Sequence, residues 1–316
     1  MKKQLKLTAL GLCAASVFSL CSFTVAATDK AAEVSTASLD GEGRTVPLTF
    51  DRYELSVSKI YNKNATAYQT AKATINGRAI TSDVRIVNGS PYVALRSFIN
   101  ETTNMTVTYK SQSRTLNIKG AGFEMDVIDG SNVIYANGRT LFSMSPSVIM
   151  TNGRMYAPLN LISKALGLSF YQSSATGAYV ISGSVKPITH GATYYDTDAV
   201  YWLARIISAE SRGESLLGQI AVGSVVMNRV NSSLYPNTIW GVIFDRKYGV
   251  QFSPILDGSI YNTPTASSVV AAKICLEGFN VNKNALFFLY PRASTSNWIP
   301  NNRTYLFSIG KHDFYA

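Results

Sequence analysis

One carboxylate stands out in the sequence because it falls on an otherwise apolar helical stripe. Val200, Leu203 and Ile207 recur at steps of three and four residues, and the next step of three reaches Glu210. Burial and the negative end of a helix both disfavour a carboxylate anion, so both raise the pKa of this group. A carboxylic acid that keeps its proton near neutral pH is what cleavage of a glycosidic bond requires. The alternative is a helix end that turns Glu210 toward solvent.

Other side chains that do chemistry are scarce, which narrows the classes of reaction. The sequence has only two histidines, His190 and His312, and three cysteines. A conventional zinc site is therefore nearly excluded, and we expect no metal and no cofactor. Three aspartates are candidates for a second carboxylate, although the sequence does not place them against the first: Asp245, Asp257 and Asp313.

Two helices should position the candidate acid. The first covers residues 197–210, with Thr197 or Asp198 as its cap, and a Ser-Arg-Gly tripeptide ends it. The second covers residues 215–230 and is apolar on nearly every face, which predicts the central buried helix of its domain. Glu214 precedes the second helix, where it can favour the positive helix end or line the cleft beside the candidate acid.

The motifs around these helices occur in a characteristic order. Ala-Glu-Ser-Arg-Gly-Glu at 209–214 precedes the apolar run at 218–230, and Gln-Phe-Ser-Pro follows at 251–254. Ile-Gly-Lys-His-Asp-Phe-Tyr occupies positions 309–315. This order is similar to that of the SleB/CwlJ-type cell wall hydrolase domain, and the resemblance covers about residues 197–316.

This resemblance implies a mostly helical, lysozyme-like fold that cleaves peptidoglycan. It also implies that Glu210 is the catalytic acid, because the first glutamate of the family's Glu-x-Arg-Gly-Glu motif falls there. The residues expected to contact the substrate are Glu214, Gln251, Phe252, Ser253 and Tyr290. Two positions depart from the family pattern. Ser211 stands where alanine is usual, and Leu-Tyr-Pro at 289–291 replaces Tyr-Asn-Pro. The second change is expected to alter the wall of the substrate cleft that contacts the sugars.

A different pattern precedes the helices, because residues 44–184 consist of short alternating runs separated by turn pairs. Four Asn-Gly pairs between apolar or β-branched residues predict four two-residue type I′ hairpins. These pairs begin at Asn76, Asn88, Asn137 and Asn152. The octapeptide that begins at Asn88 matches the one that begins at Asn152, and each continues into a helix-like stretch and a strand. We therefore expect a tandem-repeat β-rich domain, and a multidomain α+β chain.

This tandem pattern resembles the copper amine oxidase N-terminal-like domain. Despite the family's name, residues 44–184 contain neither His nor Cys, so the resemblance implies no copper here. Two interpretations of the region stay open: an extracellular docking module for wall polymer, and a spacer without a ligand. Four tyrosines at strand positions could stack on sugar rings, although half-buried packing is more typical; they are Tyr92, Tyr109, Tyr156 and Tyr171.

The N-terminal residues 1–27 are typical of a secretory signal peptide, because three lysines precede an apolar stretch and Val-Ala-Ala offers a cleavage site. An uncleaved anchor is the alternative. Residues 28–43 are expected to be a flexible lead-in, and residues 185–196 a linker between the two domains. No later segment has the apolar length of a membrane helix, so we expect no membrane span after cleavage.

The charge balance indicates the kind of partner. The chain has 29 Lys and Arg against 19 Asp and Glu, which suits a polyanionic surface such as a bacterial wall. No basic cluster or motif indicates nucleic acid. We therefore expect a secreted protein in the cell wall, or in the spore cortex or coat. Its expected partners are peptidoglycan glycan strands and anionic cell wall polymers.

The family resemblance implies the reaction of a lytic transglycosylase. In that reaction Glu210 protonates the bond between N-acetylmuramic acid and N-acetylglucosamine, and the muramoyl 6-hydroxyl closes an anhydro ring. One alternative is a hydrolase with a second carboxylate. Another is a non-catalytic protein that binds wall or coat, against which the intact Glu210 and the Gln-Phe-Ser motif argue. The sequence does not distinguish the spore cortex, cleaved in germination, from the vegetative wall.

Overall fold

The computed structural model describes residues 68–316, apart from residues 121, 145–147, 248 and 295. It also describes the backbone of two strands, β1 (Thr36–Leu39) and β2 (Thr45–Leu48), which pair antiparallel. The predicted signal peptide lies outside the described residues. Most of the predicted flexible lead-in also lies outside them, although β1 falls within it.

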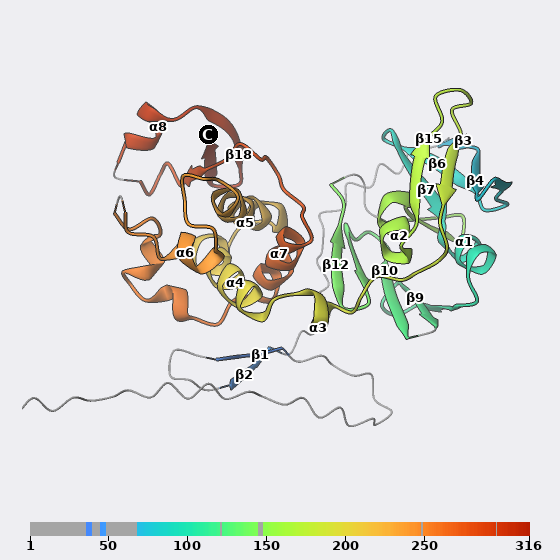
Figure 1. Ribbon diagram of the computed structural model, residues 1–316, viewed down its shortest axis with the longest axis horizontal. Coiled ribbons are helices and arrows are strands. Elements are labelled where there is room, and N and C mark those ends of the chain that lie inside the picture. The colour runs from blue at the N-terminus through green and yellow to red at the C-terminus, as the bar shows by residue number, and fades with distance from the viewer. Residues whose placement is uncertain are drawn as a thin grey trace, which may run out of the picture. The chain divides into compact units, whose positions relative to one another are not determined.

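Short strands make up most of the region between residues 68 and 184 (Figure 1). In chain order they are β3 (Gln69–Ala71), β4 (Ala73–Ile75), β5 (Arg78–Ala79), β6 (Val84–Val87), β7 (Ser90–Ala94), β8 (Thr106–Lys110), β9 (Thr115–Gly120), β10 (Phe123–Ile128), β11 (Val133–Ala136), β12 (Arg139–Phe142), β13 (Ile149–Thr151), β14 (Arg154–Pro158), β15 (Ser169–Gln172) and β16 (Tyr179–Ser182). They form sheets of order β12-β11-β10-β9-β8, β13-β14-β7-β6-β3 and β15-β16-β4-β5. Neighbouring strands are antiparallel, except that β16 runs parallel to β4.

Four Asn-Gly turns connect neighbouring strands. Their asparagines have φ between 48° and 52°, and the glycines that follow have φ between 70° and 82°. Both central residues of a type I′ turn need positive φ, which asparagine and glycine tolerate best. The residues that flank each pair are register partners, such as Ile75 with Arg78 and Ala136 with Arg139. The four predicted hairpins are therefore confirmed.

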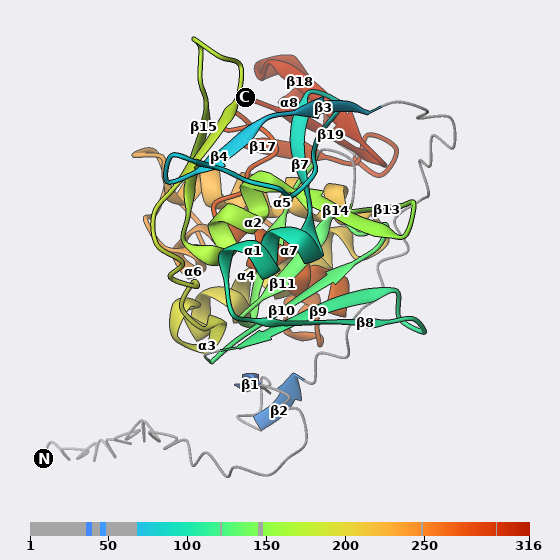
Figure 2. The same ribbon diagram turned by 90° about the vertical axis from the view of Figure 1, so that its right-hand side faces the viewer.

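A short helix follows each of the two matching octapeptides. These are α1 (Leu95–Thr102) after β7 and α2 (Leu159–Leu166) after β14, and they lead to β8 and β15 respectively. Both helices lie between the first sheet and strands β3–β7 (Figures 1 and 2). Their buried side chains, Phe98 and Ile162 among them, share one apolar core with strands of all three sheets. Removal of this apolar surface from water stabilises the region.

The strand tyrosines fall into two groups. Tyr92 and Tyr156 are 0% and 2% exposed and pack in a cluster of their own, which agrees with the packing interpretation. Tyr109 and Tyr171 are 40% and 60% exposed, so their rings are open to solvent. Only the second pair has surface with which to contact a ligand.

Helices dominate the region after residue 190. They are α3 (Gly191–Tyr194), α4 (Thr197–Ser211), α5 (Leu216–Val230), α6 (Ile239–Ile243), α7 (Ala266–Leu276) and α8 (Trp298–Asn302), with the 3-10 turns η1 (Ser253–Ile255) and η2 (Ser259–Tyr261). Strands β17 (Phe287–Leu289), β18 (Tyr305–Ile309) and β19 (His312–Tyr315) form a sheet of order β17-β19-β18. Figure 1 shows α4, α5 and α7 packed beside one another.

Close packing of these three helices depends on Gly223 in α5. A Cβ atom there would lie 2.7 Å from both Cys275 Sγ on α7 and Ile207 Cδ1 on α4. Because glycine has no Cβ atom, the helices can approach until these side chains touch the α5 backbone. Cys275 is 3% exposed, and burial raises the pKa of its thiol to about 12, which fits a packing role.

The β-rich region and the helical region belong to one compact unit and share buried side chains. Val133 of β11 is fully buried within the core of the helical region, and Phe142 of β12 packs against that core. The Phe142 ring meets the Phe279 ring edge-on, with centroids 4.8 Å apart. The sheet therefore contributes apolar surface that the helical region buries.

The predicted linker is held against the same strands. The Gly191 N–H, at the start of α3, donates to the Asn137 carbonyl at 2.8 Å, and the Asn137 side chain donates to the Ile188 carbonyl at 2.8 Å. The Tyr195 hydroxyl accepts a hydrogen bond from the Thr140 N–H at 3.0 Å. These bonds tie the connection between the two regions to the β11–β12 hairpin.

Glu277, which follows α7, is the polar centre of this boundary. Its carboxylate accepts two hydrogen bonds from Arg139 at 2.7 Å and one from Tyr195 at 2.9 Å, and lies 2.9 Å from Lys164 Nζ. Glu277 and Arg139 are only 3% and 8% exposed. Burial alone would raise the pKa of Glu277, but Arg139 and Lys164 outweigh it and lower this pKa. The ionised Glu277 carboxylate therefore stabilises the fold at neutral pH. This contribution is lost as the pH falls through the lowered pKa of Glu277.

Replacing Arg139 by alanine should leave the Glu277 anion buried without its bidentate partner. Breaking one side of a buried ion pair costs about 3–5 kcal/mol. Arg139→Ala should therefore clearly lower the free energy of unfolding in urea at neutral pH. The loss should shrink at acidic pH, as the pH falls through the lowered pKa of Glu277 and its carboxylate becomes protonated.

Lys119→Ala is the matched control, because it removes an exposed pair with Glu124 whose side chains are 53% and 43% exposed. Such a pair contributes about 1 kcal/mol or less. Equal losses in the two variants, or a loss in Arg139→Ala that does not vary with pH, would contradict the role given to the Arg139–Glu277 pair.

Candidate active site

Glu210 occupies the last turn of α4, and the stripe that leads to it is buried. Val200, Leu203 and Ile207 are 4%, 0% and 0% exposed, whereas Glu210 is partly buried. The helix ends at Ser211, so the Glu210 carboxyl group lies near the negative end of the helix. The side chain is thus neither fully solvated, as the alternative expects, nor sealed inside the core.

Burial raises the pKa of Glu210 to about 7, and the negative charge of Asp257 adds to the shift. Near neutral pH Glu210 is therefore present in both its protonated and its ionised form. Such a group can give a proton to a leaving oxygen and take a proton back later in the same reaction.

The caps of the two helices around Glu210 differ from the predicted ones. Asp196 caps α4, rather than Thr197 or Asp198, and Ser215 caps α5, rather than Glu214. Each cap accepts a hydrogen bond from the N–H three residues later, at 2.7 and 3.2 Å. A capping residue keeps an extended backbone just before the first helical residue, and Asp196 and Ser215 both have such a backbone.

Glu214 is bound instead by the C-terminal hairpin. Its Oε2 accepts a hydrogen bond from the Lys311 N–H at 3.2 Å, and its carbonyl accepts one from the Gln219 side chain at 3.0 Å. Gly310 has a φ of +59°, and a Cβ atom there would collide with Glu214 Oε2, so the turn needs glycine. Glu214 thus links the segment after α4 to the β18–β19 turn. It remains partly exposed, and its contact with a substrate stays a prediction.

Arg229 on α5 anchors the start of the loop that carries the Gln-Phe-Ser motif. It is 5% exposed, and it donates to the Leu286 carbonyl at 2.8 Å and to the Gln251 side chain at 3.4 Å. Phe252 is 2% exposed, with the Arg229 guanidinium 5.2 Å from its ring centroid. This burial corrects the expected role of Phe252 as a substrate contact, because its ring has almost no free surface. Ser253 is exposed, and Gln251 is partly exposed.

Arg205 on α4 anchors the other end of the same loop. It is 2% exposed, and its Nη1 donates to the carbonyls of Tyr261 and Asn262, the latter at 2.7 Å. No role is predicted from the sequence for Arg205 or Arg229, although Arg229 lies within the apolar run of the family pattern. The available signal was a charged residue within an apolar helical run, since a buried charge must find polar partners.

Asp257 is the candidate aspartate whose charge acts on Glu210. It lies between η1 and η2 in a turn, where its Oδ1 accepts a hydrogen bond from the Ser259 N–H at 2.8 Å. Asp245 and Asp313 instead accept hydrogen bonds from groups two and five residues away in the chain. The structure thus relates one of the three aspartates to the candidate acid.

Tyr290 and His312 lie together beside strand β17. Their ring centroids are 6.3 Å apart, and the His312 ring is 5.6 Å from that of Phe288. His312 is 7% exposed, and its Nδ1 has no hydrogen-bond partner among the described residues. Burial lowers the pKa of His312 although the Glu214 charge opposes the shift, so the imidazole is neutral at pH 7. Tyr290 is partly exposed, and its contact with a substrate stays a prediction.

Across residues 68–316, with the gaps given above, no group of three or more His, Cys, Asp or Glu side chains is arranged to hold a metal ion. Over the same part of the chain, no helix combines the length and the apolar character needed to cross a membrane.

Two family models match the chain. Residues 213–315 match the cell wall hydrolase family, and residues 74–181 match the copper amine oxidase N-terminal domain. The first match begins after Glu210, so that residue lies just outside it.

The relatives that match are spore enzymes. The spore cortex-lytic enzyme of Bacillus cereus is 39% identical over 120 residues, which are 38% of this chain and 45% of the relative. The spore cortex-lytic enzyme of Bacillus subtilis is 35% identical over 120 residues, 38% of each chain. This chain thus spans less than half the length of these relatives.

A solved structure is also similar. It is the catalytic domain of the germination-specific lytic transglycosylase SleB from Bacillus anthracis, which is 38% identical, with 39% of this chain and 97% of that chain covered at a TM-score of 0.35. The resemblances drawn from the motifs are confirmed by the family matches. The chain carries a copper amine oxidase N-terminal domain followed by a domain of the cell wall hydrolase family.

Proposed function

We propose that this protein cleaves the glycan strands of peptidoglycan, with Glu210 as the general acid. The observation that carries the proposal is a partly buried carboxyl group with a pKa of about 7 at the end of α4. Similarity to spore cortex-lytic enzymes supports the same substrate class and favours the spore cortex, during germination, as the place of action. The predicted signal peptide would carry the enzyme out of the cytoplasm.

In the proposed reaction a single carboxyl group performs both proton transfers. Protonated Glu210 gives its proton to the glycosidic oxygen between N-acetylmuramic acid and N-acetylglucosamine. The bond between this oxygen and C1 of the muramic acid then breaks. The 6-hydroxyl of the same muramic acid then bonds to C1 and gives its proton to the Glu210 carboxylate, which restores the acid. This hydroxyl is already held near the reacting carbon, so no second carboxyl group has to activate water.

The loop from Gln251 to Asn262 is the proposed wall of the substrate cleft. Gln251, Ser253, Glu214 and Tyr290 all keep exposed surface, and we assign them contacts with the sugar chain. The β-rich domain is assigned the docking of anionic wall polymer, with a spacer role as the alternative.

A hydrolase is the second candidate function, and the influence of Asp257 on Glu210 favours it. An inverting or retaining hydrolase needs a second carboxylate near the acid. Asp257 is a candidate for it, because its negative charge contributes to the raised pKa of Glu210. Two of the following experiments separate the candidates.

Glu210→Gln should remove nearly all cleavage of purified peptidoglycan, because an amide cannot donate the proton; general acid catalysis contributes about 10²–10⁴-fold. The same variant should be more stable than the wild type at about pH 8. A raised pKa means that ionising Glu210 costs stability as pH rises from 4.5 to about 7, and the amide avoids this cost.

Loss of turbidity of cell wall suspensions and the midpoint of thermal unfolding measure the two effects. Glu214→Gln is the control and should lose less activity. A Glu210→Gln variant that keeps most of its lytic rate would exclude Glu210 as the acid.

Asp257→Asn should shift the alkaline limb of the kcat/KM profile to lower pH, because loss of the nearby negative charge lowers the pKa of Glu210. Asparagine keeps the acceptor for the Ser259 N–H, so the turn should persist. Asp245→Asn is the control without a shift. A loss of about 100-fold or more at every pH would instead mark Asp257 as a second catalytic carboxylate and favour the hydrolase.

The products should end in non-reducing 1,6-anhydro-muramic acid, and a chelator should not change the rate. Mass spectrometry of the released muropeptides distinguishes the outcomes, because hydrolysis adds one water that ring closure does not. Parallel digestion of spore cortex and vegetative wall identifies the preferred substrate. Predominantly reducing ends would contradict the transglycosylase reaction while leaving Glu210 as an acid.

A further inference from the structure

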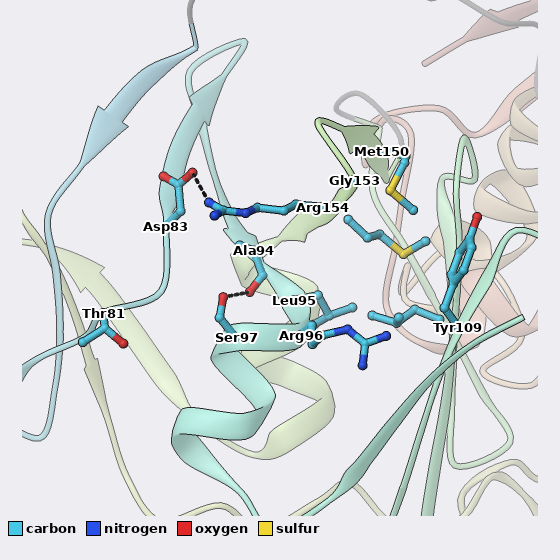
Figure 3. A pocket seen from close by; sticks show the side chains of 12 residues that line it. Thr81, Asp83, Ala94, Leu95, Arg96, Ser97, Tyr109, Met150, Gly153 and Arg154 are labelled. Atoms are coloured by element: carbon cyan, nitrogen blue, oxygen red, sulfur yellow. Dashed lines mark hydrogen bonds and ion pairs between the residues drawn. The ribbon is translucent and has the colours of Figure 1, made fainter. Parts of the chain in front are cut away.

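A cavity of about 600 Å³ opens in the β-rich domain, formed by residues between 81 and 155. It lies between the start of α1, the strands β8 and β9, and the β13–β14 hairpin (Figure 3). None of the residues assigned to the cleavage reaction lines it. The cavity is therefore a second site, on a domain for which docking and spacing are both open.

The inner wall of this cavity is apolar. Leu95, Leu116 and Met155 line it and are 0%, 3% and 5% exposed, so the wall belongs to the domain core. Met150 and the half-exposed ring of Tyr109 continue the apolar surface outward. Small aliphatic groups of a ligand can bury apolar surface against this wall, whereas a ligand that is polar throughout cannot.

Two arginines occupy opposite sides of the cavity, as Figure 3 shows. Arg96 extends toward Tyr109, and its Nη1 donates to the Val107 carbonyl at 2.8 Å, which orients the guanidinium. Arg154 extends toward Asp83, with Nη1 3.9 Å from Asp83 Oδ2, and its side chain is 65% exposed. Both guanidinium groups keep N–H groups that a carboxylate can engage in the bidentate manner typical of arginine.

The carboxylates around the cavity already have partners. Asp83 accepts hydrogen bonds from Arg85 at 2.9 Å and from the Tyr156 hydroxyl at 2.7 Å. Glu101 accepts hydrogen bonds from the backbone N–H groups of Thr81 and Ser82. Residues 68–184 contain ten Lys and Arg against five Asp and Glu, so the whole domain is cationic. The cavity is therefore complementary to an anion.

We propose that this cavity binds an acidic peptide with small aliphatic side chains, namely the stem peptide that peptidoglycan carries on its muramic acids. The choice of polymer rests on the proposed function. Stem peptides combine carboxylates with alanine methyl groups and methylene chains, which match the two arginines and the apolar wall respectively. A polyphosphate would use the arginines but not the wall, and a bare sugar chain would use neither.

Binding can be measured without cleavage by placing every variant in a full-length Glu210→Gln background. The probe is the tetrapeptide L-Ala–γ-D-Glu–meso-diaminopimelyl–D-Ala, titrated by calorimetry at low salt, and the same peptide with amidated carboxylates tests the need for charge. Arg96→Gln and Arg154→Gln should each weaken binding of the acidic peptide by about tenfold, because each removes a charge-assisted hydrogen bond. Arg78→Gln, an exposed arginine on β5 outside the cavity, should leave binding unchanged.

Tyr109→Ala tests the apolar rim separately from the charges and should also weaken binding. The proposal is overturned if the acidic peptide does not bind, if the amidated peptide binds equally well, or if Arg78→Gln loses as much affinity as Arg96→Gln. It is also overturned if poly(glycerol phosphate) or peptide-free glycan binds with the same dependence on Arg96 while the peptide does not. Because these titrations need no turnover, failure of the proposed cleavage reaction would leave their result intact.

Discussion

The candidate active site depends on a loop that two buried arginines hold in place. Arg205 on α4 donates to carbonyls at the end of the loop, and Arg229 on α5 donates to Gln251 at its start. A buried guanidinium is costly without such partners, so the helices can carry these charges only while the loop lies against them. The same bonds keep Asp257, in the middle of the loop, where its charge acts on Glu210. The environment of the proposed acid is therefore set by two helices and a loop together, and not by the Glu-x-Arg-Gly-Glu segment alone.

The position of Glu210 balances two requirements on a general acid. The carboxyl group must be sufficiently shielded from water to keep its proton at neutral pH. It must also be accessible to a polymeric substrate. The end of α4 meets both, because the apolar stripe lies behind Glu210 while the chain turns away after Ser211. An ionised carboxylate in such surroundings costs stability, and the close packing of α4, α5 and α7 around Gly223 is the main apolar core that can offset this cost.

The β-rich domain contributes buried contacts to the helical region, which a flexible tether would not provide. Val133 is buried in the core of the helical region, and the Arg139–Glu277 pair lies at the boundary, so the two regions stabilise each other. This arrangement gives the proposed peptide site a physical purpose. A domain that holds a stem peptide raises the effective concentration of the attached glycan strand near the hydrolase domain, since both are parts of one compact unit.

The sequence by itself determined the features that depend on neighbouring residues. Periodicity placed Glu210 after Val200, Leu203 and Ile207, the Asn-Gly pairs located four hairpins, and the motifs identified both domains. These features follow from local backbone preferences and from short spacings. In each case, all the residues that determine the feature lie within one short segment of the chain. The helix caps were off by one or two positions, because Asp196 and Thr197 are equally good caps until the backbone of each is known.

Only the tertiary structure decided which distant residues meet. Phe252 belongs to the core, Arg205 and Arg229 anchor a loop far along the chain, and Glu214 bonds the turn at Gly310. Arg139 meets Glu277 across 138 residues, and Arg96 and Arg154 come to opposite sides of one cavity from separate hairpin-and-helix units. A sequence pattern gives the face on which a residue lies. It does not give the partner across that face, because the partner depends on how whole elements pack and on which buried polar groups that packing satisfies.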